Sequence, residues 1–427
     1  MPKGYAMYWL RKRILKYRWK RIHAAWKRGE RLTLPLRVPS VLVTGSLGKT
    51  TTCRMVAHIL SSSGLYVALS TTQGLFLNGV TRRLGDSATC PYASKLLLDR
   101  KVQAAVFELA HAALARDGIA FDGCDVSAVL NVRDNHVGFG GIDSVEDIAR
   151  IKSQVAQVAR RMVVLNADDP FCLAMRDQVR ATETCLVTMD ARNAVVLGHL
   201  EQGGAAAVCQ PDAGEIRFLR GEHVLCAVRV EEIPSTWGGL YRPAVGMAMF
   251  AMALAIGLGI EPGVVADGLR SFVSDERGNP GRMNVRNDLP YRLILTTGDG
   301  PEPIRALVDL VGRLPVGGRR ILMLAAMGNR TDAFLRSLGR TAAGAFDTYV
   351  CSDSVELRGR SPGEVATLLA EGLDEAGVTP ERIRVAENHD AALRMAFAEA
   401  RQGDLLVVQS FHSGMAHALG LVPPRRA

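Results

Sequence analysis

The chain has 427 residues, 48% of them hydrophobic and 22% charged, which is typical of a globular protein with more than one buried core. No apolar stretch reaches the ~18 residues that a membrane-spanning helix needs, and the eight cysteines include no Cys-x-x-Cys pair, so the sequence favours neither an integral membrane protein nor a zinc or disulfide framework. The net charge of +9 is concentrated at the N-terminus, and the nearly neutral remainder argues against nucleic acid as a partner.

Residues 1–37 contain twelve Lys and Arg residues against one acid, Glu30, with Tyr and Trp residues interleaved. This pattern predicts a basic amphipathic helix. Two interpretations stay open: the helix binds an anionic surface such as a membrane, or it packs its apolar face on the next domain. Charges stand where a secretory signal would have its apolar core, so we expect a cytoplasmic protein, either free or peripheral at the membrane.

The next segment, Val41–Thr52, reads Val-Leu-Val-Thr-Gly-Ser-Leu-Gly-Lys-Thr-Thr-Thr. An apolar strand enters a glycine turn, and a helix begins at Lys-Thr-Thr, which is the pattern of a phosphate-binding loop. The first glycine of the full Walker pattern is replaced by Val43. Lys49 is expected to reach the terminal phosphates of ATP, and the Thr50 hydroxyl is expected to ligate Mg²⁺. The remaining predicted phosphate contacts are Gly45, Ser46, Gly48 and Thr51.

After this loop, strand-like and helix-like segments alternate, which predicts a doubly covered, mostly parallel sheet. The expected helices are 49–63 and 144–161, and the expected strands are 66–72, 104–109, 126–132 and 162–166. Short alternating runs at about 195–235 suggest a small antiparallel insertion.

A buried helix is expected over 244–260, and the polar run 273–282 with Gly278–Gly281 reads as a linker. Beyond it, strands expected at 293–295, 321–324, 348–351 and 405–408 alternate with helices. The predicted organisation is an α/β central ATP-binding domain over 38–275 and a C-terminal Rossmann-like α/β domain over 276–427.

Ligands of parallel sheets gather at the carboxyl ends of the strands, so polar residues there are candidates. Glu108 ends a strand beside the loop and is a natural Mg²⁺ ligand, or else a helix cap. His136 follows another strand and could serve a metal or a phosphate, although alone it is more often a surface histidine. Lys152 lies on the apolar stripe of helix 144–161. There its ammonium group must extend to solvent, pair with a carboxylate or be chemically modified. Asn166 could face a nucleotide base or form a turn.

In order and spacing, these segments resemble the Mur ligase family, and within it the Mur-ligase-like half of cyanophycin synthetases. The resemblance covers about residues 38–408, and it is carried by 44–52, 108, 118–170, 280–282 and 357–360. It implies an ATP-dependent ligase that activates a carboxylate as an acyl phosphate and lets an amino group attack to form an amide. The substrates would be a small-molecule or peptide carboxylate and an amine such as an amino acid.

The same resemblance assigns further roles. Glu108 and His136 match metal-associated residues, and Lys152 matches a lysine that is carbamylated in several Mur ligases, where it serves a second Mg²⁺. Asn166 matches an adenine-facing Asn, and Arg282 matches an Arg that reaches the γ-phosphate. Catalytic roles would therefore fall to Lys49, His136, Lys152 and Arg282, with ATP and Mg²⁺ as cofactors.

The departures from the family pattern concern mostly the C-terminal half. Asn135 replaces an Asp, Met247 stands near the place of an expected Asn, and the motifs at 296–301 and 328–332 are altered. Two alternatives to a ligase with an altered acceptor therefore stay open: a membrane-associated ligase similar to poly-γ-glutamate synthetase, and a nucleotide-binding pseudo-ligase subunit. The sequence names neither substrate, and it leaves open whether identical chains assemble into an oligomer.

Overall fold

The computed structural model describes residues 33–134, 137, 142–298, 300–411 and 419–422, and isolated positions between 13 and 28. Most of the predicted basic segment 1–37 and His136 lie outside the described residues. The described chain forms two compact units, 1–272 and 273–427, each of which is treated by itself. Among the described residues, no helix combines the length and the apolarity needed to cross a bilayer.

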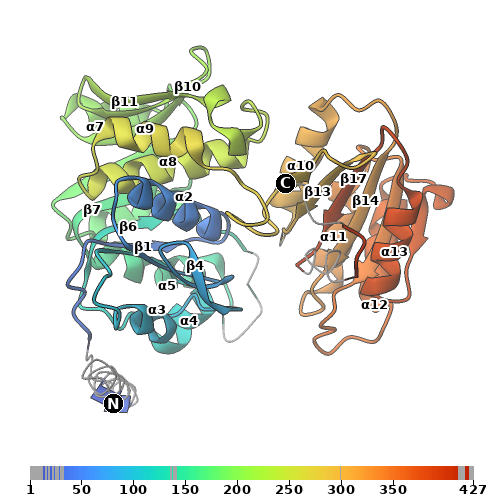
Figure 1. Cartoon of the computed structure of the whole chain (residues 1–427), viewed down its shortest axis with the longest axis horizontal. Coiled ribbons are helices and arrows are strands. Elements are labelled where there is room, and N and C mark those ends of the chain that lie inside the picture. Colours follow the sequence, from blue (N-terminus) through green and yellow to red (C-terminus); the bar gives the residue numbers. More distant parts are fainter. Residues whose placement is uncertain are drawn as a thin grey trace. The chain divides into compact units, whose positions relative to one another are not determined.

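The first unit is built on an eleven-stranded sheet with the order β11-β10-β9-β8-β7-β6-β1-β5-β2-β3-β4 (Figure 1). The strands from β9 to β2 in this order pair in parallel, and both ends of the sheet are antiparallel. The strand bounds are β1 (Ser40–Thr44), β2 (Val67–Thr71), β3 (Gly74–Leu77), β4 (Val80–Leu84), β5 (Ala104–Glu108), β6 (Cys124–Val129), β7 (Ala159–Asn166), β8 (Glu183–Thr188), β9 (Ala205–Gln210), β10 (Glu215–Arg220) and β11 (His223–Arg229).

Helices cover both faces of this sheet. One hydrophobic core lies beneath α2, α8 and α9, and a second lies beneath α3, α4, α5 and α7 (Figure 1). The helix bounds are α2 (Lys49–Ser62), α3 (Cys90–Leu96), α4 (His111–Asp117), α5 (Val145–Gln157), α6 (Pro170–Ala174), α7 (Ala194–Glu201), α8 (Arg242–Gly257) and α9 (Pro262–Ser271), with short 3-10 turns η1 (Met175–Gln178), η2 (Val230–Glu232) and η3 (Pro234–Thr236). The parallel sheet covered on both faces confirms the predicted fold class.

Local sequence explains the helix that follows the phosphate loop and the one that carries Lys152. Gly48 precedes α2 with a φ of 83°, a left-handed conformation that favours glycine. Helix α5 begins with a capping box in which Ser144 and Asp147 satisfy each other's backbone amides. On α5, Ile148, Lys152 and Val155 are all buried, as the predicted stripe requires.

Two expectations need correction. Helix α5 ends at Gln157 rather than Arg161, because residues from Ala159 onward already belong to β7 and pair with β6. The region 195–235 is also not a separate antiparallel insertion. It contains a helix, α7, and strand β9 pairs in parallel with β8, so that only β10 and β11 are antiparallel while extending the same sheet.

The second unit is a six-stranded sheet with the order β12-β13-β17-β14-β15-β16, in which only β12 is antiparallel. Helices α11 and α12 pack against each other, and α13 covers the core formed by β13, β14 and β17. The bounds are β12 (Asn284–Arg286), β13 (Arg292–Thr296), β14 (Arg320–Ala326), β15 (Thr348–Asp353), β16 (Ile383–Val385), β17 (Leu405–Gln409), α10 (Pro301–Arg313), α11 (Asp332–Ala342), α12 (Glu364–Glu375) and α13 (His389–Glu399), with a 3-10 turn η4 (Pro380–Arg382).

All eight cysteines fall in the described part of the chain, and each is buried with a free thiol. No disulfide framework supports either unit. Their stability therefore rests on the hydrophobic cores and on backbone pairing.

Candidate functional site

The phosphate loop lies at the carboxyl end of β1, between β5 and β6 in the first sheet. Lys49 begins α2, and its Nζ donates to the carbonyl of Ser46 at 3.1 Å. Among the described residues, no side chain caps the N-terminus of α2, and no acidic residue lies in its first turn. The loop therefore presents a lysine and an uncapped helix N-terminus, both of which favour an anion.

A buried carboxylate stands directly behind this helix N-terminus. Glu108, at the end of β5, has no exposed surface. Its Oε2 accepts hydrogen bonds from the Thr50 hydroxyl at 2.8 Å and from the Thr72 amide at 3.1 Å. Within the described chain, the other oxygen, Oε1, is buried and accepts no hydrogen bond.

This arrangement fits a divalent cation. A carboxylate oxygen and a hydroxyl are hard ligands of the kind that Mg²⁺ and Mn²⁺ prefer, and a buried carboxylate oxygen without a partner is otherwise unfavourable. No group of three or more His, Cys, Asp or Glu residues suited to a metal occurs in the described ranges. Glu108 and Thr50 are residues of the described structure that could hold such a cation.

Lys152 is the second buried charge-bearing residue of the site. Its side chain has no exposed surface, and its Nζ has no hydrogen-bond partner in the described part of the chain. Burial, together with the smaller effect of the positive charge on Lys49, lowers the pKa of Lys152 from 10.5 to about 7. At neutral pH a large fraction of Lys152 is therefore an uncharged amine.

Asn166 ends β7 at the same edge of the sheet. Its Nδ2 donates to the carbonyl of Leu130 at 2.8 Å, and its Oδ1 accepts the Asp168 amide at 3.0 Å. Asp168 in turn accepts the Thr188 hydroxyl at 2.5 Å. The local geometry is therefore that of the turn that the sequence suggested for Asn166. The contact of Asn166 with a nucleotide base stays a prediction.

Sequence reasoning missed three residues that shape this site. Thr72 joins Thr50 and Glu108, and its hydroxyl lies 3.0 Å from that of Thr50. Asn131 holds the phosphate loop through its side chain. Asp169 is buried in an ion pair with Arg133 at 2.6 Å. The available signal was a polar residue just after a strand, which Thr72 and Asn131 both satisfy.

Met247 on α8 lies against the loop. A Cβ added at Gly48 would come within 3.2 Å of its Cγ. An apolar side chain therefore stands beside the phosphate loop where the family resemblance led us to expect an Asn.

Arg282 belongs to the second unit. It is half-buried, and its guanidinium donates to the hydroxyl of Thr297. In the same unit, Arg360 donates to the carbonyl of Gly328 at 3.1 Å and pairs with Asp332 at 2.7 Å. Segment 357–360, which carries the family resemblance, thus lies beside segment 328–332, which departs from it.

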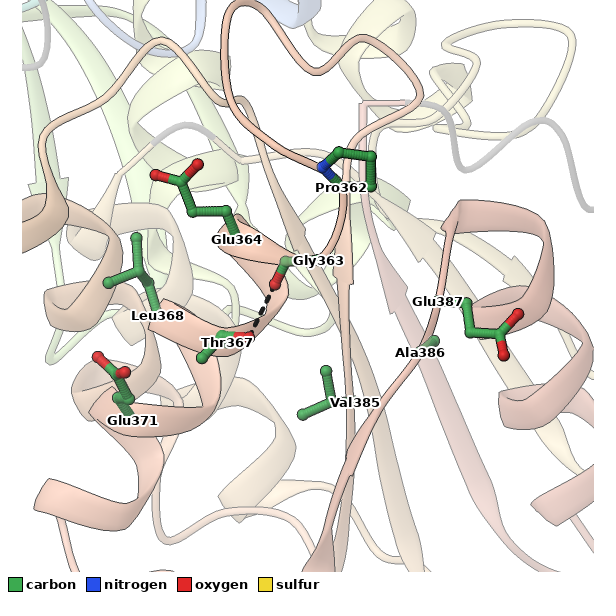
Figure 2. Close-up of a pocket in the computed structure, with 9 residues that line it drawn as sticks. All are labelled: Pro362, Gly363, Glu364, Thr367, Leu368, Glu371, Val385, Ala386 and Glu387. Carbon is green, nitrogen blue, oxygen red and sulfur yellow. Dashed lines mark hydrogen bonds between the residues drawn. The ribbon is translucent and has the colours of Figure 1, made fainter.

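The second unit also has a groove of about 550 Å³ between α12 and β16 (Figure 2). Glu364 and Glu371 of α12 already pair with Arg360 and Arg336. The acidic lining makes this groove unsuited to a phosphate. Its lining residues are Pro362, Gly363, Glu364, Thr367, Leu368, Glu371, Val385, Ala386 and Glu387.

Comparison with known proteins gives two family matches. Residues 43–223 match the Mur ligase middle domain, and residues 281–410 match the Mur ligase glutamate ligase domain. A cyanophycin synthetase of Synechocystis sp. is 35% identical over 92% of this chain and 44% of its own length. The chain thus spans less than half the length of this curated relative.

More distant similarities are also to ligases. The UDP-N-acetylmuramoyl-L-alanyl-D-glutamate–2,6-diaminopimelate ligase of Caldanaerobacter subterraneus is 23% identical over 86% of this chain and 71% of its own length. Among solved structures, a bifunctional folylpolyglutamate synthase/dihydrofolate synthase of Yersinia pestis, complexed with AMPPNP and a Mn ion, has the same fold. It aligns with a TM-score of 0.64 at 20% identity over 90% of this chain and 89% of that one.

Proposed function

This chain belongs to the Mur ligase family, and from that premise we propose that it is an ATP-dependent ligase joining a carboxylate to an amine. The observation that carries the proposal is the site around the phosphate loop. Lys49 and the uncapped N-terminus of α2 stand next to Glu108, whose buried Oε1 accepts no hydrogen bond in the described chain. Phosphate binding and cation binding are the two needs of phosphoryl transfer from ATP.

In the proposed reaction, a carboxylate oxygen attacks the γ-phosphorus of ATP and ADP leaves. An uncharged amino group then attacks the acyl carbon, phosphate leaves with its bonding electrons, and the nitrogen gives up one proton to phosphate or solvent as the amide forms. Lys49 would hold the phosphate oxygens while negative charge builds on them. Gly45, Ser46, Gly48 and Thr51 would shape the loop around them.

Thr50 and Glu108 would hold a divalent cation, which we assign as Mg²⁺. Such an ion, when bound, offsets phosphate charge and orients the reacting groups. His136 remains a proposed partner of this ion from the family resemblance alone. Asn166 is proposed for the adenine, and Arg282 for the γ-phosphate, on the same ground.

Lys152 is proposed to be carbamylated. Only an uncharged amine can attack CO₂, and burial keeps much of Lys152 uncharged near pH 7. The amine nitrogen bonds to the carbon of CO₂ and releases one proton to solvent, which gives an anionic carbamate with two oxygen ligands for a metal ion. The alternative is a plain buried lysine with a purely structural role.

The test of the ligase proposal is an ADP-release screen with mixtures of carboxylic acids and amino acids. A ligase releases ADP continuously only when both substrates are present, and Lys49→Ala should abolish this turnover. Mass spectrometry of the products would identify the amide. Tight ATP binding with no substrate-dependent ADP release across the screen would instead identify a pseudo-ligase subunit.

A further inference from the structure

The segment that leaves β6, residues 130–133, holds the phosphate loop from one side. The side-chain Oδ1 of Asn131 accepts hydrogen bonds from the amides of Ser46 at 2.9 Å and Leu47 at 2.8 Å. Its Nδ2 donates to the carbonyl of Leu47 at 3.2 Å. One amide side chain thus pairs with three backbone groups of the loop.

Backbone contacts reinforce this clamp. The Ser46 amide also donates to the carbonyl of Asn131 at 3.0 Å. Gly45 comes so close that a Cβ there would lie 3.0 Å from the Cβ of Leu130. The Arg133 amide donates to the Ser46 hydroxyl at 3.0 Å. The loop therefore lies directly against residues 130–133.

The clamp divides the loop's amides into two groups. Those of Ser46 and Leu47 already have acceptors in Asn131. At the start of α2 the Thr52 amide donates to the carbonyl of Gly48 at 3.0 Å, so residues 48–51 form the N-terminus of this helix. The amides from Gly48 to Thr51 are therefore those that a helix N-terminus directs toward an anion.

We propose that Asn131 is a positioning residue, whose neutral amide fixes the first half of the phosphate loop so that its second half receives the ATP phosphates. This inference rests on the proposed ATP-dependent function and deepens it. It assigns phosphate binding to the amides of 48–51 and a supporting role to those of Ser46 and Leu47.

The side chain at position 131 must also be uncharged. An Asp at position 131 has nearly the same shape and still accepts the amides of Ser46 and Leu47, but it loses the hydrogen bond that Nδ2 donates to the carbonyl of Leu47. Its negative charge, however, would stand next to the loop that receives phosphates, and like charges in a partly buried site repel strongly. An Ala at this position removes the clamp without adding charge.

The experiment measures binding of Mg–AMPPNP and Mg–ADP to the full chain by calorimetry, together with thermal melting of each variant without nucleotide. Asn131→Asp, which keeps two of the three contacts, should melt no lower than Asn131→Ala but bind AMPPNP about tenfold or more weakly than the wild type, the loss being larger for AMPPNP than for ADP because repulsion grows with phosphate charge. Asn131→Ala should weaken both nucleotides by about the same factor, about tenfold.

Asn388→Ala is the matched control. It also removes an Asn side chain that accepts a backbone amide, that of Ala391 at 2.9 Å, but in the second unit. It should leave nucleotide affinity unchanged. A purely structural role for Asn131 predicts that the Asp variant, like the Ala variant, weakens AMPPNP and ADP by the same factor, and that result would overturn the proposal.

Lys49→Ala separates this inference from the proposed function. If the wild type binds AMPPNP and Lys49→Ala does not, while Asn131→Asp is unaffected, the function stands and the role of Asn131 is refuted. If the wild type binds no adenine nucleotide, the proposed function itself fails.

Discussion

Lys49 folds back over the loop that it follows, with its Nζ on the carbonyl of Ser46. In that position its charge is near the loop before any ligand arrives. Replacing it with Ala should weaken AMPPNP binding at least about tenfold, because a hydrogen bond to a charged group contributes ~1.5–3 kcal/mol. Calorimetric titration of the variant measures this change, and unchanged affinity would refute phosphate binding by Lys49.

The lowered pKa of Lys152 predicts that the stability of the fold depends on pH. The unfolded chain holds this proton up to about pH 10.5, whereas the folded chain loses it at about pH 7. Between these values the unfolded state binds more protons, so folding becomes more favourable as pH rises. Below pH 7 both states are protonated, and this contribution no longer changes.

Thermal melting checks this prediction against Lys152→Met, which has no titrating group. The melting temperature of the wild type relative to the variant should rise from pH 7 to pH 9 and stay flat from pH 6 to pH 5. The comparison should be made in CO₂-depleted buffer, and then with bicarbonate. A bicarbonate-dependent mass increase of one CO₂, absent in the Met variant, would support carbamylation. A difference in melting temperature between the two proteins that does not change with pH would contradict a buried lysine with a lowered pKa.

At the scale of an element, the start of α2 depends on Gly48. Its φ of 83° disfavours a side chain, and a Cβ would meet Met247. Gly48→Ala should destabilise the fold by about 1 kcal/mol or more and weaken AMPPNP binding, because the helix N-terminus would shift. Chemical denaturation and calorimetry measure the two effects.

Gly64, just beyond the other end of α2, is the matched control. It has a φ of 88° and no atom within 4 Å of an added Cβ. Gly64→Ala should show the conformational cost alone and keep full nucleotide affinity. Adding Met247→Ala to Gly48→Ala should restore little, because a flexible methionine yields easily while the backbone strain remains. Equal nucleotide affinity in the two glycine variants would contradict the role given to Gly48.

Elements with a strong local pattern were predictable from sequence. The strand, turn and helix of Val41–Ser62 and the apolar stripe around Lys152 follow from periodicity over a few residues. The end of α5 was not predictable, because Ala159 joins the sheet only through its pairing with Cys124. The direction of β9 likewise depends on which neighbour it meets.

The candidate site was likewise predictable from sequence only in part. Lys49, Thr50 and Glu108 were found because each stands at a recognisable place, in a motif or at a strand end. Asn131 and Thr72 were missed because their roles arise from contacts with segments 85 and 36 residues away. Their local signal, a polar residue just after a strand, does not reveal which distant segment such a residue contacts. The expected contribution of His136 stays a prediction.

At the scale of the whole molecule, the basic segment carries more than the chain's net charge. Deleting residues 1–35 should abolish sedimentation with anionic vesicles at low salt, because each basic residue near such a surface contributes about 1 kcal/mol. AMPPNP affinity should stay unchanged. Neutral phosphatidylcholine vesicles are the control, and a full chain that ignores anionic vesicles would favour the packing interpretation.

The distribution of thiols gives the molecule a built-in reporter of unfolding. Seven of the eight buried cysteines, from Cys53 to Cys226, belong to the first unit, and only Cys351 belongs to the second. Burial raises the pKa of Cys90 and of Cys351 to about 12, so neither is a reactive thiolate in the native state. A thiol-reactive dye added during denaturation would therefore count one group when the second unit opens and seven when the first does. The order in which the two units melt can thus be determined without any engineered label.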